Sequence, residues 1–182
     1  EPIPFDPMEI ALHDAYGKSA AIDERPQYRM IHEYPLSGMP PMMTHIFDNF
    51  SGRRIIAAKG APETMMQVSE LSDAEKKSVN AALEELSAEG FRVLAVGGSA
   101  FAGNDFPASQ QELRFRFNGL VAFYDPPKKN ISNVFASFYK AGIDVKIITG
   151  DNAATTSTIA KQINFRGAEK TMSGEALVRM NE

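Results

Sequence analysis

The sequence contains no cysteine, no apolar run long enough for a membrane span and no block of basic residues. Without cysteine, the chain can form no disulfide, no zinc–thiolate site and no thiol nucleophile. A spanning helix would need about 18 or more consecutive apolar residues. The net charge is only -4, which argues against nucleic acid as a partner. These absences leave a globular protein of one large or two small domains.

Metal-binding and phosphate-binding motifs are also scarce. The three histidines, His13, His32 and His45, are scattered without ligand spacing. Three methionines close to His45 suit a loop or a core better than a soft-metal site. We therefore expect no metal site in this chain. The Walker phosphate-loop pattern is incomplete, because Leu12 stands where its first glycine should be.

Two aspartates follow two predicted strands in the C-terminal third. Residues 119–124 precede Asp125, and residues 143–148 precede Thr149-Gly150-Asp151. Between them, apolar residues recur at helical spacing from Ile131 to Phe138. A strand, helix and strand within about 30 residues predict a βαβ unit with parallel strands. Ligands of such sheets collect at the carboxyl ends of the strands, and a helix N-terminus favours phosphate. The pattern therefore suggests phosphate chemistry.

The first two thirds of the chain show a different pattern. A helix is predicted from Met8 to Tyr16, and residues 44–48 and 53–58 read as an antiparallel hairpin. Ser72 opens a capping box, and the helix behind it should stop at Gly90. Residues 91–96 and 113–117 read as further strands. We therefore predict an α/β protein with two domains: an α+β domain over 1–118, with an antiparallel sheet and packed helices, and a partial parallel α/β domain over 119–182.

The segment Lys59-Gly60-Ala61-Pro62-Glu63 joins an apolar strand to a helical stretch. Gly60 allows close backbone approach, and Pro62 suits the first turn of a helix. One interpretation is an ordinary strand-to-helix turn. The other places the Lys59 ammonium at the mouth of a pocket for an anionic ligand. The residues alone leave both interpretations open.

Five motifs in order carry a resemblance to a known family. Three of them are Lys59-Gly60-Ala61-Pro62-Glu63, Asp125-Pro126-Pro127-Lys128 and Thr149-Gly150-Asp151-Asn152. The other two are the segments that begin at Asp6 and at Arg92. Together they closely resemble the cytoplasmic catalytic region of P-type (E1-E2) cation-transporting ATPases, from about Pro4 to Leu177.

The resemblance implies a role for each motif. Residues 1–118 would be the nucleotide-binding domain, and residues 119–182 would be part of a Rossmann-like phosphorylation domain of the haloacid-dehalogenase type. The residues expected to bind ATP are Asp6, Glu9, Leu36, Lys59, Gly60, Arg92 and Leu94. The residues expected to support phosphoryl transfer are Asp125, Thr149, Gly150 and Asp151. Arg92 would reach the phosphates or bridge toward the second domain, and Leu94 would be a wall of the pocket.

Departures from the family pattern predict weak nucleotide binding. Leu36 stands where the family carries an aromatic residue, and Pro40-Pro41 stand where it carries a basic pair. Loss of a base–aromatic stack costs about 1–3 kcal/mol. The Asp-Lys-Thr-Gly-Thr segment with the phosphorylated aspartate and the Gly-Asp-Gly segment with a Mg²⁺ ligand are both missing. We expect them outside this chain, which should therefore bind ATP without turning it over.

The implied parent protein couples ATP hydrolysis, through an aspartyl-phosphate, to cation transport. ATP and Mg²⁺ would be its cofactors. The partners of this segment would be the rest of the phosphorylation domain and the actuator and transmembrane parts, at the cytoplasmic face of a plasma membrane. An uncovered parallel strand could also promote self-association. The transported ion is not readable from these residues. Two alternatives stay open: a soluble haloacid-dehalogenase-type phosphatase with a large cap, and a non-catalytic interaction domain.

Overall fold

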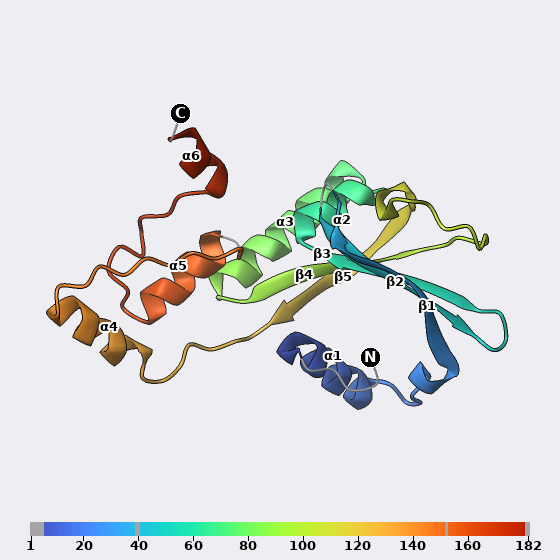
Figure 1. The fold of residues 1–182 in the computed structure, drawn as a ribbon, viewed down its shortest axis with the longest axis horizontal. Helices are drawn as coiled ribbons and strands as arrows, with labels where there is room; N and C mark the ends of the chain where they lie inside the picture. Colours follow the sequence, from blue (N-terminus) through green and yellow to red (C-terminus); the bar gives the residue numbers. More distant parts are fainter. Residues whose placement is uncertain (1–5, 39–40, 152, 181–182) are drawn as a thin grey trace. The chain divides into compact units, whose positions relative to one another are not determined.

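A five-stranded sheet organises the fold (Figure 1). The computed structural model describes residues 6–38, 41–151 and 153–180. The sheet order is β1-β2-β3-β4-β5. Its strands are β1 (Tyr28–Ser37), β2 (Met42–Asn49), β3 (Arg54–Gly60), β4 (Arg92–Ser99) and β5 (Phe115–Phe123). The helices are α1 (Pro7–Ser19), α2 (Pro62–Val68), α3 (Asp73–Ala88), α4 (Ile131–Lys140), α5 (Ala153–Gln162) and α6 (Gly174–Arg179), with short 3-10 turns η1 (Arg25–Gln27) and η2 (Gln110–Glu112).

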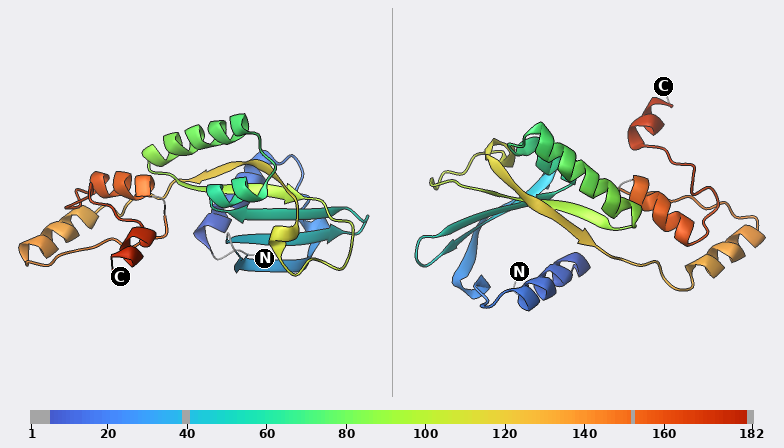
Figure 2. Two further views of the ribbon diagram at one scale, coloured as in Figure 1. Left: turned by 90° about the horizontal axis from the view of Figure 1, so that it is seen from above. Right: turned by 180° about the vertical axis from the view of Figure 1, so that it is seen from behind.

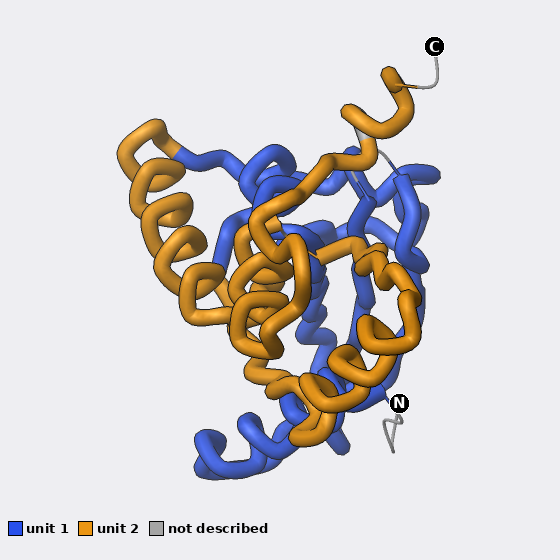
Figure 3. Tube along the Cα trace, turned by 90° about the vertical axis from the view of Figure 1, so that its left-hand side faces the viewer, with its two compact units in different colours: residues 1–71, 95–119 blue, residues 72–94, 120–182 orange. Residues whose placement is uncertain are grey.

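The chain divides into two compact units (Figure 3). Residues 1–71 and 95–119 form the first, and residues 72–94 and 120–182 form the second. We describe each unit by itself. The domain boundary at 118–119 stays a prediction.

An antiparallel meander forms the first unit, which confirms the antiparallel sheet with packed helices. Strands β1, β2 and β3 pair in order, and β3 pairs with β4 in the same sense. The predicted hairpin is present, with Asp48 opposite Arg54 at its turn. The side chains of Asp48 and Arg54 form a bidentate ion pair, with N–O distances of 2.7 and 2.8 Å.

One face of this sheet is buried and the other is more open. Alternate residues of β2 and β3 are buried, because side chains of a strand point to opposite faces in turn. Helix α2 packs on the buried face through Met65. A Cβ atom built on Gly97 would lie 2.6 Å from Met65 Cε and 3.0 Å from the Arg116 carbonyl oxygen. Only glycine fits there. Figure 2 shows the sheet from two further sides. The buried apolar residues include Tyr34, Met42, Ile46, Ile56, Ala58, Met65, Ala95, Leu113 and Phe115.

The second unit contains the capped helix that the sequence predicts. Ser72 and Glu75 form the capping box of α3, and Gly90 follows the end of this helix with a φ of +85°. Helix α3 packs against α5. The hydroxyl of Thr155 in α5 donates to the Phe91 carbonyl oxygen at 3.0 Å. Helix α4 also forms as predicted.

The predicted βαβ unit is confirmed only in part: its first strand and its helix form, and its second strand does not. Residues 143–148 form no strand, whereas residues 119–123 are the last part of β5. Ile148 is 96% exposed and Ile147 is 41% exposed. A strand of a parallel sheet is normally covered on both faces and paired with neighbours. The described part of the chain supplies no such neighbour for residues 143–148, so their apolar pattern has no sheet to join.

Candidate functional site

An ion pair between β3 and α1 brings together two of the predicted binding residues. The Lys59 ammonium lies 2.8 Å from Glu9 Oε1, and each side chain is about one-third exposed, 33% and 32%. Asp6 is the N-cap of α1, and its carboxylate accepts from the backbone N–H groups of Met8 at 2.9 Å and Glu9 at 3.2 Å. Asp6 therefore fixes the start of the helix that carries Glu9. The N-terminal end of a helix also favours anions.

The pKa of Glu9 is lowered, first by its hydrogen bond from Lys59. The pKa of Glu9 is therefore lower in the folded state than in the unfolded state. At pH values above the unfolded-state pKa, the ion pair stabilises the fold in full. This stabilisation is lost as the pH falls through the folded-state pKa. We expect acid unfolding of the Glu9→Gln variant to depend less on pH below about 4.5. Urea unfolding midpoints between pH 3 and pH 6, about the range in which carboxylates titrate, would measure this. If the urea midpoint changes with pH equally in the wild type and in Glu9→Gln, this expectation is wrong.

Gly60 closes β3 and is buried. A Cβ atom there would lie 3.4 Å from both Met42 Cβ and Thr64 Cγ2. This is tight packing between the end of the strand and helix α2, whose first residue is Pro62. The strand-to-helix turn is thus confirmed, and it holds Lys59 immediately before it.

The β1–β2 connection carries the departures from the family pattern. Leu36 lies near the end of β1 and is 67% exposed. Pro41 is exposed in the turn, whereas Pro40 lies outside the described residues. The structure therefore shows an exposed aliphatic side chain at the position expected for an aromatic residue.

A second cluster lies in the second unit. Arg92 Nε is 3.2 Å from Asp151 Oδ1. The Thr149 hydroxyl oxygen accepts from the Asp151 backbone N–H at 3.0 Å, and Gly150 lies exposed between these residues. The structure thus brings Arg92, Thr149, Gly150 and Asp151 together. Asp125 is exposed shortly after β5.

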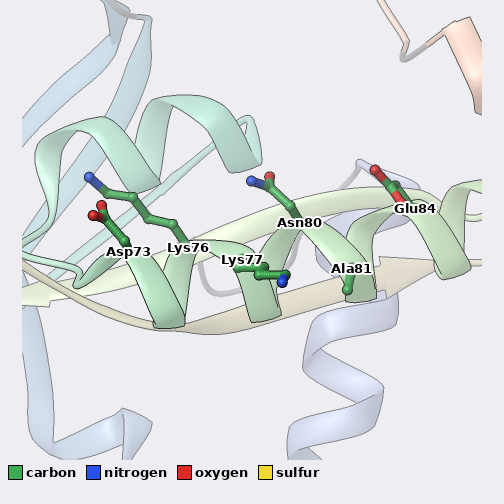
Figure 4. A pocket seen from close by; sticks show the side chains of 6 residues that line it. All are labelled: Asp73, Lys76, Lys77, Asn80, Ala81 and Glu84. Atoms are coloured by element: carbon green, nitrogen blue, oxygen red, sulfur yellow. The ribbon is translucent and has the colours of Figure 1, made fainter.

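Surface hollows do not coincide with these clusters. The first lies along α3, where polar side chains project from the helix (Figure 4). The second lies beside Arg54 and residues 99–102. Leu94 lines neither hollow and is half-buried in β4. Among residues 6–38, 41–151 and 153–180, no group of three or more histidine or acidic side chains could hold a metal ion.

Two polar groups of the first unit were not predicted from sequence. His45 Nε2 lies 3.5 Å from Glu33 Oε1 across β1 and β2. Gln110 is buried and bonds to Thr44, which lies 66 residues earlier. Once the hairpin is placed, the alternation of β2 puts His45 on the same face as Lys59. No comparable sequence pattern predicts the burial of Gln110 or its bond to Thr44.

In the part of the chain that the structure describes, no helix is both long and apolar enough to cross a bilayer.

Comparisons with known proteins give one consistent result. Residues 5–130 match the family model described as P-type ATPase, cytoplasmic domain N. The chain is 30% identical to a calcium-transporting ATPase of Bacillus subtilis over 97% of its own length and 22% of the relative. It is 30% identical to a sodium/potassium exporting P-type ATPase of Schizosaccharomyces pombe, over 88% of the chain and 17% of the relative.

A magnesium-transporting P-type ATPase of Salmonella typhimurium is also 30% identical, over 63% of the chain and 14% of the relative. The chain therefore spans about a fifth of the length of the Bacillus and Schizosaccharomyces relatives, at 22% and 17%. These matches confirm the resemblance drawn from the five motifs. The chain belongs to the family of P-type ATPase cytoplasmic N domains.

Proposed function

We propose that this chain is the nucleotide-binding segment of a P-type ATPase that couples ATP hydrolysis to cation transport across a membrane. The observation that carries the proposal is the Lys59–Glu9 pair, which stands at the end of β3 on the open face of the sheet. Family membership and the names of the relatives support the pump over a soluble phosphatase.

The residues fit ATP better than they fit a metal ion. Lys59 offers a cation for the nucleotide, and Gly60 turns the backbone beside it. Arg92 lies in the second unit, where it pairs with Asp151, and its role toward the phosphates stays a prediction. Bound ATP would supply the γ-phosphoryl group, and the aspartate that accepts it would lie outside this chain. The described residues contain no acidic or histidine cluster for Mg²⁺, so the Mg²⁺ ligands would be supplied mainly from elsewhere in the parent protein.

The C-terminal segment fits this proposal as an incomplete part. Residues 119–182 would belong to a haloacid-dehalogenase-like phosphorylation domain whose other strands come from the rest of the parent chain. The actuator and transmembrane parts would be further partners, and the segment would face the cytoplasm, at a plasma membrane. Exposed apolar residues such as Ile148, Leu177 and Val178 would favour self-association of the separated segment.

The chain should bind adenine nucleotides weakly. We expect a dissociation constant for a non-hydrolysable ATP analogue in the high micromolar to millimolar range, about -4 to -6 kcal/mol. The reason is that Leu36 replaces an aromatic stacking partner. An NMR chemical-shift titration would measure it, with shifts expected for Lys59 and Gly60. No saturable shift up to about 10 mM, about -2.7 kcal/mol, would instead support the non-catalytic interaction domain.

The isolated chain should form no acyl-phosphate. Incubation with γ-labelled ATP and Mg²⁺ should leave it unlabelled, because the Asp-Lys-Thr-Gly-Thr segment is absent from its sequence. A P-type ATPase that contains this segment serves as the positive control. Acid-stable, hydroxylamine-sensitive label on this chain would contradict the proposal.

A further inference from the structure

Helix α1 packs on the first unit through a half-buried stripe. The structure describes all of α1, and none of its residues is buried. The half-buried side chains within it recur at helical intervals of three and four and are Met8, Glu9, Leu12, His13 and Tyr16. An isolated helix shorter than about 12–15 residues is marginal in water. Helix α1 therefore depends on its contacts with the rest of the unit.

Arg25, in the 3-10 turn η1, contacts α1 at two residues of this stripe. Its Nη1 donates to His13 Nδ1 at 2.9 Å, and its guanidinium carbon lies 4.8 Å from the centre of the Tyr16 ring. Because a guanidinium can only donate, His13 accepts here as a neutral ring. The Tyr16 hydroxyl accepts in turn from the Glu24 backbone N–H at 3.3 Å. The connection between α1 and β1 therefore folds back onto the helix.

Asp23 fixes the direction of the Arg25 side chain. Asp23 Oδ1 accepts from Arg25 Nε, and Asp23 Oδ2 accepts from Arg25 Nη2, both at 2.9 Å. Oδ1 also accepts from the Arg25 backbone N–H at 3.0 Å. Such a bidentate pair sets the plane of the guanidinium. Both side chains are exposed, and an isolated exposed pair contributes little, but here the pair belongs to a network that also includes His13 and Tyr16.

The Arg25 contacts lie close to the residue that pairs with Lys59. His13 follows Glu9 by one helical turn on the same face, about 6 Å along the helix axis. If α1 turned by one residue position, about 100°, Glu9 would no longer point toward Lys59. The Glu9–Lys59 pair at 2.8 Å therefore requires a fixed rotation of the helix. Contacts one turn away are well placed to provide it.

We propose that Arg25 is a positioning residue: through His13 and Tyr16 it sets the rotation of α1 and thereby keeps Glu9 beside Lys59. Arg25 lies outside the five motifs, and it lies 34 residues before Lys59 in the sequence. The effect on nucleotide affinity rests on the function proposed above, whereas the effect on α1 itself does not.

The first test follows α1 without any nucleotide, by NMR at pH about 7.5, where histidine is mostly neutral. In Arg25→Ala, the amide of Ile10, which donates to the Asp6 carbonyl oxygen at 3.0 Å, should exchange with water about fivefold faster or more. The NOE between the Glu9 and Lys59 side chains should weaken. A purely local role of Arg25 in its own turn would change neither quantity. Wild-type exchange at Ile10 together with an unchanged NOE would overturn the proposal.

The second test measures the affinity for a non-hydrolysable ATP analogue. Arg25→Ala should raise the dissociation constant about threefold or more, because a displaced α1 takes Glu9 out of the site. A wild-type affinity combined with a weakened NOE would show that the position of α1 does not matter for nucleotide binding. If the wild type binds no nucleotide, the proposed function is wrong, and the exchange and NOE measurements still decide the position of α1.

Matched variants separate geometry from charge. Arg53→Ala removes an exposed arginine whose Nη1 lies 3.7 Å from Glu24 Oε2, and it should behave as the wild type does in both tests. Arg25→Lys keeps the charge but cannot bind Asp23 with two bonds and contact His13 at the same time, so it should restore little. Full rescue by lysine would overturn the proposal. Should Arg25→Ala fail to fold, Asp23→Asn, which weakens the bidentate pair, should move both NMR quantities in the same direction.

Discussion

Replacement of Lys59 by alanine should raise the dissociation constant of a non-hydrolysable ATP analogue about tenfold or more, about 1.4 kcal/mol. Two effects add. The variant loses a charge-assisted interaction with the nucleotide, which is worth about 1.5–3 kcal/mol. It also leaves the Glu9 carboxylate, now 2.8 Å from an ammonium, without its partner and facing an anionic ligand. Isothermal calorimetry or NMR titration would measure the loss.

Three further variants test the same site. Lys18→Ala removes an exposed lysine from the last turn of α1 and should bind as the wild type does. The double variant Lys59→Ala/Glu9→Gln should bind more tightly than Lys59→Ala, because the uncompensated carboxylate is gone. Leu36→Phe should strengthen binding if the family's aromatic position faces the base. Unchanged affinity in Lys59→Ala would place the pocket elsewhere.

Replacement of Gln110 by leucine should lower the free energy of unfolding by about 2–4 kcal/mol. Gln110 is 2% exposed. Its Nε2 donates to the Met42 carbonyl oxygen at 2.7 Å, with longer contacts to Pro35 at 3.3 Å and Ser37 at 3.2 Å. Its Oε1 accepts from the Thr44 hydroxyl at 2.8 Å. Leucine would leave the buried Thr44 hydroxyl and the Met42 carbonyl without this partner, and unpaired buried groups are costly.

Urea denaturation would measure the effect on stability. Gln67→Leu, on the exposed side of α2, is the matched control and should change stability by no more than about 0.5 kcal/mol. Thr44→Val combined with Gln110→Leu should recover part of the loss, because replacing both partners by apolar groups removes the unpaired hydroxyl. A loss below about 0.5 kcal/mol for Gln110→Leu would show that water or rearrangement satisfies these groups.

Local signals explain which parts of the fold were predictable. The capping box at Ser72, the stop at Gly90 and the hairpin around residues 49–52 each depend on neighbours within a few residues. All three are present. Residues 143–148 were predicted as a strand from their apolar pattern alone. A parallel strand depends on partners distant in sequence, and the described chain gives these residues none.

The candidate site was likewise predictable in one part and unpredictable in another. The family motifs placed Glu9 and Lys59 together, although 50 residues separate them. Periodicity alone could not have done so. The Glu33–His45 pair follows only from the register of β1 and β2, which has a shift between Met30 and His32. Gln110 lies outside every predicted element, so its partners on β1 and β2 could not be inferred.

The hydrogen bonds of Gln110 also bear on the order in which the protein folds. They reach back 66 to 75 residues along the chain, whereas β1, β2 and β3 pair with their immediate successors. During synthesis, strands β1, β2 and β3 have all been made about 50 residues before Gln110, counting from Gly60. Long loops close late. We therefore expect the hydrogen bonds of Gln110 to form late in folding, after the strands have paired. Replacement of Gln110 should then speed unfolding in stopped-flow experiments and leave the folding rate nearly unchanged.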